Sequence, residues 1–146
     1  MRVIVLVENT SISKDYKSKH GLCLYIETKK HKLLFDLGSN SLFLENAVKL
    51  GVNITDIDSV IISHGHNDHG GALKYFLENN AKANIYISRY AFEEYYANFL
   101  GMKWNVGLDR KLKDHPRIIL IEDEYVIDEE LQIFSNIEEH LYLPTA

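Results

Sequence analysis

The sequence predicts an α/β fold, in which helices and strands form layers around one hydrophobic core. Two observations support this prediction. Short runs of β-branched residues alternate with segments of helical apolar spacing over the first hundred residues, and a more strand-rich stretch follows. The length of 146 residues suits one domain that can bury a core, so we assign residues 1–146 to a single domain.

The first expected elements are strands. Residues 2–7 (RVIVLV) form a continuous apolar run that is typical of a buried strand. Residues 9–21 are polar and predict a loop. Residues 22–28 and 32–36 predict two strands that are joined by a lysine-rich turn, in which we expect His31 to be exposed to solvent.

Helices and strands then alternate. An apolar stripe predicts a helix over residues 39–50, which Ser39 or Asn40 can cap and Gly51 closes. The remaining expected elements are a buried strand at 59–63, a helix at 72–79 opened by Gly70 and Gly71, a strand at 84–88, an aromatic helix at 89–101, and strands at 117–122 and 131–136.

The composition limits the function classes. A net charge of −5 without a basic stripe disfavours binding to nucleic acid or to an anionic membrane. The single cysteine, Cys23, excludes an internal disulfide and is expected to be buried. The N-terminal apolar run, Val3 to Val7, is shorter than the roughly 7–15 residues of a signal-peptide core, so we expect a cytoplasmic protein.

The segment SHGHNDHGG, residues 63–71, places His64, His66, Asp68 and His69 directly after a predicted strand, where α/β folds collect their sites. Residues two apart in extended backbone point the same way, so His64 and His66 can hold one ion together. Asp68 and His69 are adjacent and are expected to diverge toward a second position. Imidazole and carboxylate suit Zn²⁺, and also Fe or Mn. A bound ion lowers the pKa of its water to about 7, and Asp68 could orient that water or take its proton.

This motif resembles the His-x-His-x-Asp-His signature of the metallo-β-lactamase superfamily. The stretch LLFDLGSN, which contains Asp36, is similar to an Asp-containing loop that precedes the signature in that family. In this chain, Leu37 stands where the family usually has Thr. Residues 19–27, 43–51 and 56–73 resemble one branch in particular, the hydrolases related to the dihydropterin-ribofuranosyl-aminobenzene phosphate synthase. The resemblance covers roughly residues 2–100 well and the tail poorly.

The resemblance implies an αββα sandwich with a dinuclear metal site at its sheet edge, of which this chain would form the N-terminal half to two-thirds. His64 and His66 would belong to the first metal, and Asp68 and His69 to the second. Asp36 would organise these ligands from a second shell. The resemblance also places the loop with His20 near the site, as a candidate substrate contact. Asn9 either faces the site from the end of the first strand or bonds its own backbone in a turn.

The family completes its metal site with a later His, a bridging Asp and a final His, and no such later motif is present here. Only His115, which we expect in a surface turn, and His140, an alternative ligand, follow the cluster. Three explanations stay open. The chain is the N-terminal half of a longer protein, or it binds one ion with His64, His66 and one of Asp68, His69 or His140, or two chains complete a site between them.

The sequence therefore favours a metal-dependent hydrolase that uses a metal-bound hydroxide on a small ester, amide or phosphoester. The alternative is a truncated metal-binding module that is catalytically incomplete alone or completes its site by oligomerisation. The expected partner is a small-molecule substrate, with neither nucleic acid nor membrane. A second copy of the chain is a further candidate partner, because a half-sandwich would expose an apolar face that a homo-oligomer could cover.

Overall fold

The computed structural model describes residues 1–99 and 101–135. Its centre is a six-stranded sheet with the strand order β1-β2-β3-β4-β5-β8. The strands are Arg2–Val7 (β1), Cys23–Glu27 (β2), Lys32–Phe35 (β3), Ser59–Ile62 (β4), Asn84–Ser88 (β5) and Ile118–Ile121 (β8). The first three are antiparallel neighbours, whereas β3, β4, β5 and β8 pair in parallel. The carboxyl ends of the parallel strands therefore meet at one edge of the sheet.

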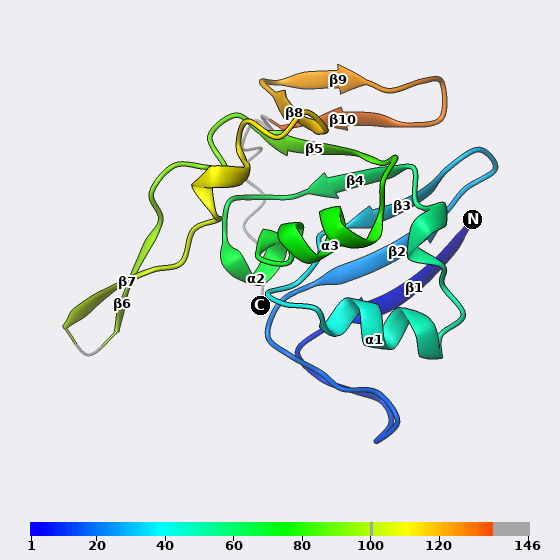
Figure 1. Ribbon diagram of the computed structural model, residues 1–146, viewed down its shortest axis with the longest axis horizontal. Coiled ribbons are helices and arrows are strands. Elements are labelled where there is room, and N and C mark those ends of the chain that lie inside the picture. The colour runs from blue at the N-terminus through cyan, green and yellow to red at the C-terminus, as the bar shows by residue number, and fades with distance from the viewer. Residues whose placement is uncertain (100, 136–146) are drawn as a thin grey trace, which may run out of the picture.

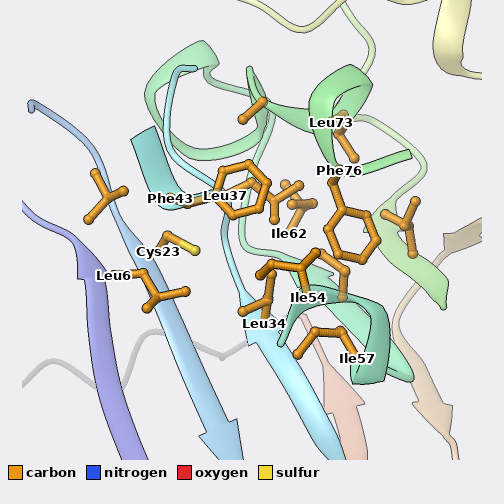
Figure 2. Close-up of a cluster of buried hydrophobic side chains, with 14 of the residues drawn as sticks. Leu6, Cys23, Leu34, Leu37, Phe43, Ile54, Ile57, Ile62, Leu73 and Phe76 are labelled. Carbon is orange, nitrogen blue, oxygen red and sulfur yellow. The ribbon is translucent and has the colours of Figure 1, made fainter. Parts of the chain in front are cut away.

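Helices cover one face of this sheet (Figure 1). They are Leu42–Lys49 (α1), Asn67–Gly70 (α2) and Leu73–Asn79 (α3), with two short 3-10 turns at Ile54–Asp56 (η1) and Arg110–Leu112 (η2). The core lies between the helices and the sheet, where Leu34 of β3 meets Phe43 of α1 and Phe76 of α3 (Figure 2). All three side chains are fully buried. Cys23 is buried in the same cluster, as expected.

The layered α/β architecture predicted from the sequence is confirmed. The expected strands lie at the predicted places with bounds that differ by one or two residues. The helix expected at 39–50 is shorter and runs from Leu42 to Lys49. Of the two expected capping residues, Asn40 accepts a hydrogen bond from the Leu42 N–H with its Oδ1 at 3.2 Å, whereas the residue directly before the helix, Ser41, makes no capping bond with its side chain. The described residues form one helix layer on one principal sheet, which corresponds to half of an αββα sandwich.

The aromatic helix predicted at 89–101 is wrong. Residues 96–99 form the strand β6 (Tyr96–Phe99), which pairs antiparallel with β7 (Met102–Asn105) in a hairpin that projects from the sheet (Figure 1). The aromatic residues matched helical spacing, but aromatic side chains also favour strands. Gly101, with a φ of +77°, adopts the left-handed backbone that a tight hairpin turn requires.

Two further strands, Glu124–Val126 (β9) and Gln132–Phe134 (β10), form a second hairpin beside β8. The Tyr125 ring of β9 lies against the Tyr86 ring of β5 in a tilted arrangement, with 5.3 Å between the ring centroids and 49° between the ring planes. Among the described helices, we find none that combines the length and the apolar character needed to cross a membrane.

Candidate metal centre

The histidine cluster lies at the carboxyl edge of the parallel strands. The chain leaves β4 at Ile62, passes through Ser63, His64 and Gly65, and enters the short helix α2 after His66. Gly65 is required at its position because a Cβ there would overlap the backbone carbonyl oxygen of Ala91. The loop therefore packs directly on the segment that follows β5.

A second backbone contact fixes the far side of the cluster. The Asn67 N–H donates to the carbonyl oxygen of Val106 at 2.7 Å, and His66 forms an isolated antiparallel bridge with Gly107. These contacts come from the segment after β7, which is distant in sequence. The motif is thus held between two segments that the sequence pattern did not connect with it.

Three of the four predicted ligands converge. The donor atoms of His64, Asp68 and His69 all lie within 4.8 Å of one another, and Nε2 of His69 is 3.6 Å from Oδ2 of Asp68. We expected the adjacent side chains of Asp68 and His69 to diverge. They approach each other instead, and a hydrogen bond from Nδ1 of His69 to Asp36, which lies outside the motif, holds the ring.

The fourth predicted ligand, His66, lies beside this group. Its ring meets the His64 ring at 4.6 Å between centroids and the Tyr95 ring at 5.2 Å, with an edge-to-face geometry in both pairs. The sequence does not indicate that Tyr95 lies at the site, because the aromatic spacing around it predicts a helix. The structure thus places His66 next to the convergent group and not within it.

Asp36 is the residue that orients the cluster. Its carboxylate is fully buried, and Oδ2 accepts hydrogen bonds from Nδ1 of His69 at 2.7 Å and from Oγ of Ser63 at 2.8 Å. Oδ1 accepts from the Ser63 N–H at 2.8 Å, and Oγ of Ser63 is 2.9 Å from Nδ1 of His64. Since Ser63 Oγ–H donates to Asp36, that oxygen accepts from His64. Both Nδ1 atoms then carry hydrogen, which leaves both Nε2 lone pairs for a ligand.

The backbone around Asp36 is held in an uncommon conformation. Asp36 has a φ of +58°, a left-handed value that aspartate adopts more readily than most residues. The Asp36 N–H donates to Ile61 at 2.8 Å and the Leu37 N–H donates to His69 at 2.7 Å, so both neighbouring peptides are fixed. Leu37, which stands where the resembling family has Thr, is fully buried in the core.

The electrostatics favour neutral imidazole at His64. Burial lowers the pKa of His64, the neighbouring His69 and His66 lower it further, and the carboxylates of Asp36 and Asp68 offset only part of this shift. Neutral imidazole is the form that binds metal ions.

The loop between β1 and β2 also reaches the cluster. Nε2 of His20 is 3.1 Å from Oδ2 of Asp68, and Nδ1 of His20 is 3.1 Å from Oδ1 of Asn9. The Leu22 N–H donates to the carbonyl oxygen of Asp68 at 3.3 Å. The structure therefore places both Asn9 and His20 at the site, although Asn9 bonds His20 and the Gly21 N–H, not its own backbone.

The comparisons with known proteins agree with this geometry. The sequence model of the metallo-beta-lactamase superfamily matches residues 19–144. The chain belongs to the metallo-beta-lactamase superfamily. An uncharacterized protein of Methanocaldococcus jannaschii is 32% identical over 132 residues, which are 87% of this chain and 50% of that protein.

Solved structures show the same fold. A metal-dependent hydrolase of the beta-lactamase superfamily is 26% identical and has a TM-score of 0.68, over 90% of this chain and 46% of that chain. A quorum-quenching N-acyl homoserine lactone lactonase has a TM-score of 0.56 at 19% identity, over 77% of this chain and 48% of that one. This chain thus spans about half the length of the relatives that it matches.

The residues of this metallo-beta-lactamase domain fit a divalent metal ion. Two imidazoles and one carboxylate form a typical three-ligand set for zinc. Two ligand atoms that are each about 2.0–2.2 Å from a tetrahedral ion lie roughly 3.3–3.6 Å apart. The 3.6 Å between Nε2 of His69 and Oδ2 of Asp68 agrees with this separation.

The other histidines lie away from the convergent group. His115 is partly buried and its Nδ1 accepts from the Arg117 N–H at 3.3 Å. His140 lies outside the described residues. His31, which we expected to be solvated, is instead mostly buried, with Nδ1 3.1 Å from Asp58 and Nε2 3.0 Å from Asp128. The turn itself gives no sign of this burial, because Asp58 and Asp128 come from distant segments.

Proposed function

We propose that this chain provides the metal-binding part of a metal-dependent hydrolase that acts on a small ester, amide or phosphoester. The observation that supports this proposal most directly is the convergence of the donor atoms of His64, Asp68 and His69 within 4.8 Å. The similarity to a metal-dependent hydrolase with a TM-score of 0.68 also supports it.

Each residue of the cluster has a defined role in this proposal. His64, His66, Asp68 and His69 hold the metal, which is Zn²⁺ or alternatively Fe or Mn, as one or two ions. A bound divalent ion supplies Lewis acidity and lowers the pKa of water to about 7. Asp68 also acts as the catalytic carboxylate, because its carboxylate oxygen that does not bind the metal can orient a water molecule or accept its proton. Asp36 fixes the tautomers and orientations of His64 and His69.

The acidic character of the chain supports a small substrate. The net charge of −5 does not favour phosphate-backbone or anionic-lipid partners. Self-association and a cytoplasmic location stay predictions.

The alternative is a metal-binding module that cannot catalyse hydrolysis alone. It is compatible with a chain that spans 50% of the M. jannaschii relative and 46% of the similar metal-dependent hydrolase. The alternative and the hydrolase differ in activity, since only the hydrolase releases product from a simple phosphoester or ester.

The experiment is a measurement of the metal-to-chain ratio by elemental analysis after exhaustive dialysis, followed by a hydrolysis assay on generic phosphoesters and esters. We expect bound metal in the wild-type chain and its loss in His69→Ala. His115→Ala is the matched control, because it removes a histidine outside the group. Metal with turnover supports the hydrolase, metal without turnover favours the module, and no metal contradicts both.

A further inference from the structure

The β1–β2 loop brings a further imidazole to the carboxylate of Asp68, outside the His-x-His-x-Asp-His motif. We infer that His20 is a metal ligand of this centre, donating the lone pair of Nε2 alongside Asp68. The inference rests on the proposed function, because it extends the same metal centre. It gives a role to a residue that lies far from the motif in sequence.

The proton on His20 can be located from its neighbours. Oδ1 of Asn9 accepts the Gly21 N–H at 3.1 Å, which fixes the orientation of the Asn9 amide, because a backbone N–H can only donate. Nδ1 of His20 is 3.1 Å from this same oxygen, so Nδ1 carries hydrogen and donates. In neutral His20, Nε2 is then a bare lone pair.

This lone pair faces another acceptor. Nε2 of His20 is 3.1 Å from Oδ2 of Asp68, and a carboxylate oxygen cannot donate. Two acceptors at this distance repel each other unless a cation or a proton lies between them. The 3.1 Å separation is slightly shorter than the roughly 3.3–3.6 Å between two ligand atoms of one tetrahedral ion, so a shift of a few tenths of an ångström in the exposed His20 side chain lets both atoms bind one ion.

His69 repeats this arrangement on the same oxygen. Its Nδ1 hydrogen is committed to Asp36 at 2.7 Å, and its Nε2 is 3.6 Å from Oδ2 of Asp68. Lone pairs from two elements, the β1–β2 loop and α2, thus face one carboxylate oxygen. A proton on His20 would relieve one of these contacts, whereas metal ions at Asp68 satisfy both.

The position of His20 is not explained by packing. Its side chain is 81% exposed, so the core does not hold it. The backbone holds it instead, because the Leu22 N–H donates to the Asp68 carbonyl and a Cβ at Gly21 would overlap that carbonyl oxygen. Gly21, with a φ of +127°, allows the loop to lie against Asp68 and present His20 to it. His20 and Asp68 would then hold a metal ion together, next to the group formed by His64, Asp68 and His69.

The test is a titration of the metal-free 146-residue chain with Co²⁺, followed by its visible absorption, and with Zn²⁺, followed by calorimetry. Wild type is compared with His20→Ala, His20→Gln, His64→Ala and the control His115→Ala. The His20→Gln variant offers an amide donor to Asp68 but removes the imidazole lone pair. We expect both His20 variants to bind at least about tenfold more weakly, or to lose one ion per chain, with a changed Co²⁺ spectrum.

The outcomes separate the inference from the proposed function. Wild-type affinity, stoichiometry and spectrum in both His20 variants would overturn the inference alone, provided that His64→Ala weakens binding. Restoration by His20→Gln would also overturn it, since His20 would then act as a hydrogen-bond donor. A wild-type chain that binds neither ion would overturn the proposed function together with the inference.

Discussion

The buried carboxylate of Asp36 and the imidazole of His69 are joined by a 2.7 Å hydrogen bond across 33 positions of sequence. The same carboxylate reaches His64 through Ser63. One residue at the end of β3 therefore sets the tautomers of two histidines that follow β4. Carboxylates that bond ligating histidines in this way orient the rings and raise their basicity.

Replacing Asp36 by asparagine should weaken metal binding without removing a ligand. An amide side chain at this position has one acceptor oxygen, so it cannot serve Nδ1 of His69 and both donors of Ser63. We expect the dissociation constant for Zn²⁺ to rise about 10–100-fold, as is usual when an outer hydrogen-bond partner of a metal ligand is lost. Calorimetric titration of the metal-free variant measures this change.

Ser63→Ala is the matched control for Asp36→Asn. It removes the Oγ link to His64 and leaves the bond between Asp36 and His69 in place. We expect it to have a smaller effect on affinity than Asp36→Asn. Equal affinities for wild type and Asp36→Asn would contradict the organising role of Asp36.

Local patterns in the sequence predicted the sheet and the cluster, because both depend on short-range order. β-Branched runs gave the strands, and the spacing of His64, His66, Asp68 and His69 gave the candidate site. Ser63 was missed even though it directly precedes His64, because a serine at a strand end has many ordinary roles. Its function depends on Asp36, which is 27 positions away.

The errors share one cause, which is that tertiary contacts override local preference. Residues 89–101 matched a helix, yet Tyr96 to Phe99 pair with a neighbouring strand. His31 stood in a charged turn and looked solvated, yet Asp58 and Asp128 meet its ring from distant segments. A single sequence contains no signal for these pairings.

The contact between the β1–β2 loop and Asp68 should depend on Gly21. Gly21→Ala combines an unfavourable left-handed backbone, about 1–2 kcal/mol, with overpacking of about 1–3 kcal/mol against the Asp68 carbonyl. Gly51→Ala is a control for the backbone cost alone, because its φ is +70° and open space surrounds it. We expect urea unfolding to show a larger loss of stability for Gly21→Ala. Equal losses of unfolding free energy in the two variants would show that the loop does not pack tightly against the Asp68 carbonyl.

Cys23 should be unreactive in the folded protein. Burial raises the pKa of the Cys23 thiol, and the negative charge of Asp36 raises it further, so little thiolate forms at neutral pH. We expect a disulfide reagent such as dithionitrobenzoate to label the native chain slowly and the urea-unfolded chain fast. Rapid labelling under native conditions, at the rate of the unfolded chain, would mean that the core around Cys23 is open.

The His31 cluster should make stability depend on pH. His31 bridges Asp58, which precedes β4, and Asp128, which lies between β9 and β10, so it ties the second hairpin to the sheet. Burial alone would lower the pKa of His31, but the hydrogen bonds to Asp58 and Asp128 and their charges outweigh burial and raise it. The pKa of Asp128 is lowered, first by the Glu130 N–H and then by His31.

These shifts define two pH windows. A raised histidine pKa stabilises the fold fully below its unfolded value of about 6.5, and this stabilisation is lost as pH rises through the folded value. A lowered aspartate pKa stabilises the fold above about 3.9, and this stabilisation is lost as pH falls through the folded value. The contribution of the cluster is therefore greatest between about pH 4 and 6.5.

Urea unfolding at a series of pH values tests this expectation. Wild type should lose stability as pH rises from about 6 to 9, and His31→Gln, which cannot titrate, should lose less over the same range. His115→Gln is the control, because His115 contacts a backbone N–H and no described carboxylate bridges its ring. The neighbouring pair of Lys32 and Asp56 does not contribute to this change in stability, since the pKa of Lys32 is raised and lies above the pH range of the experiment. Parallel pH profiles for wild type and His31→Gln would exclude His31 as the titrating group of this cluster.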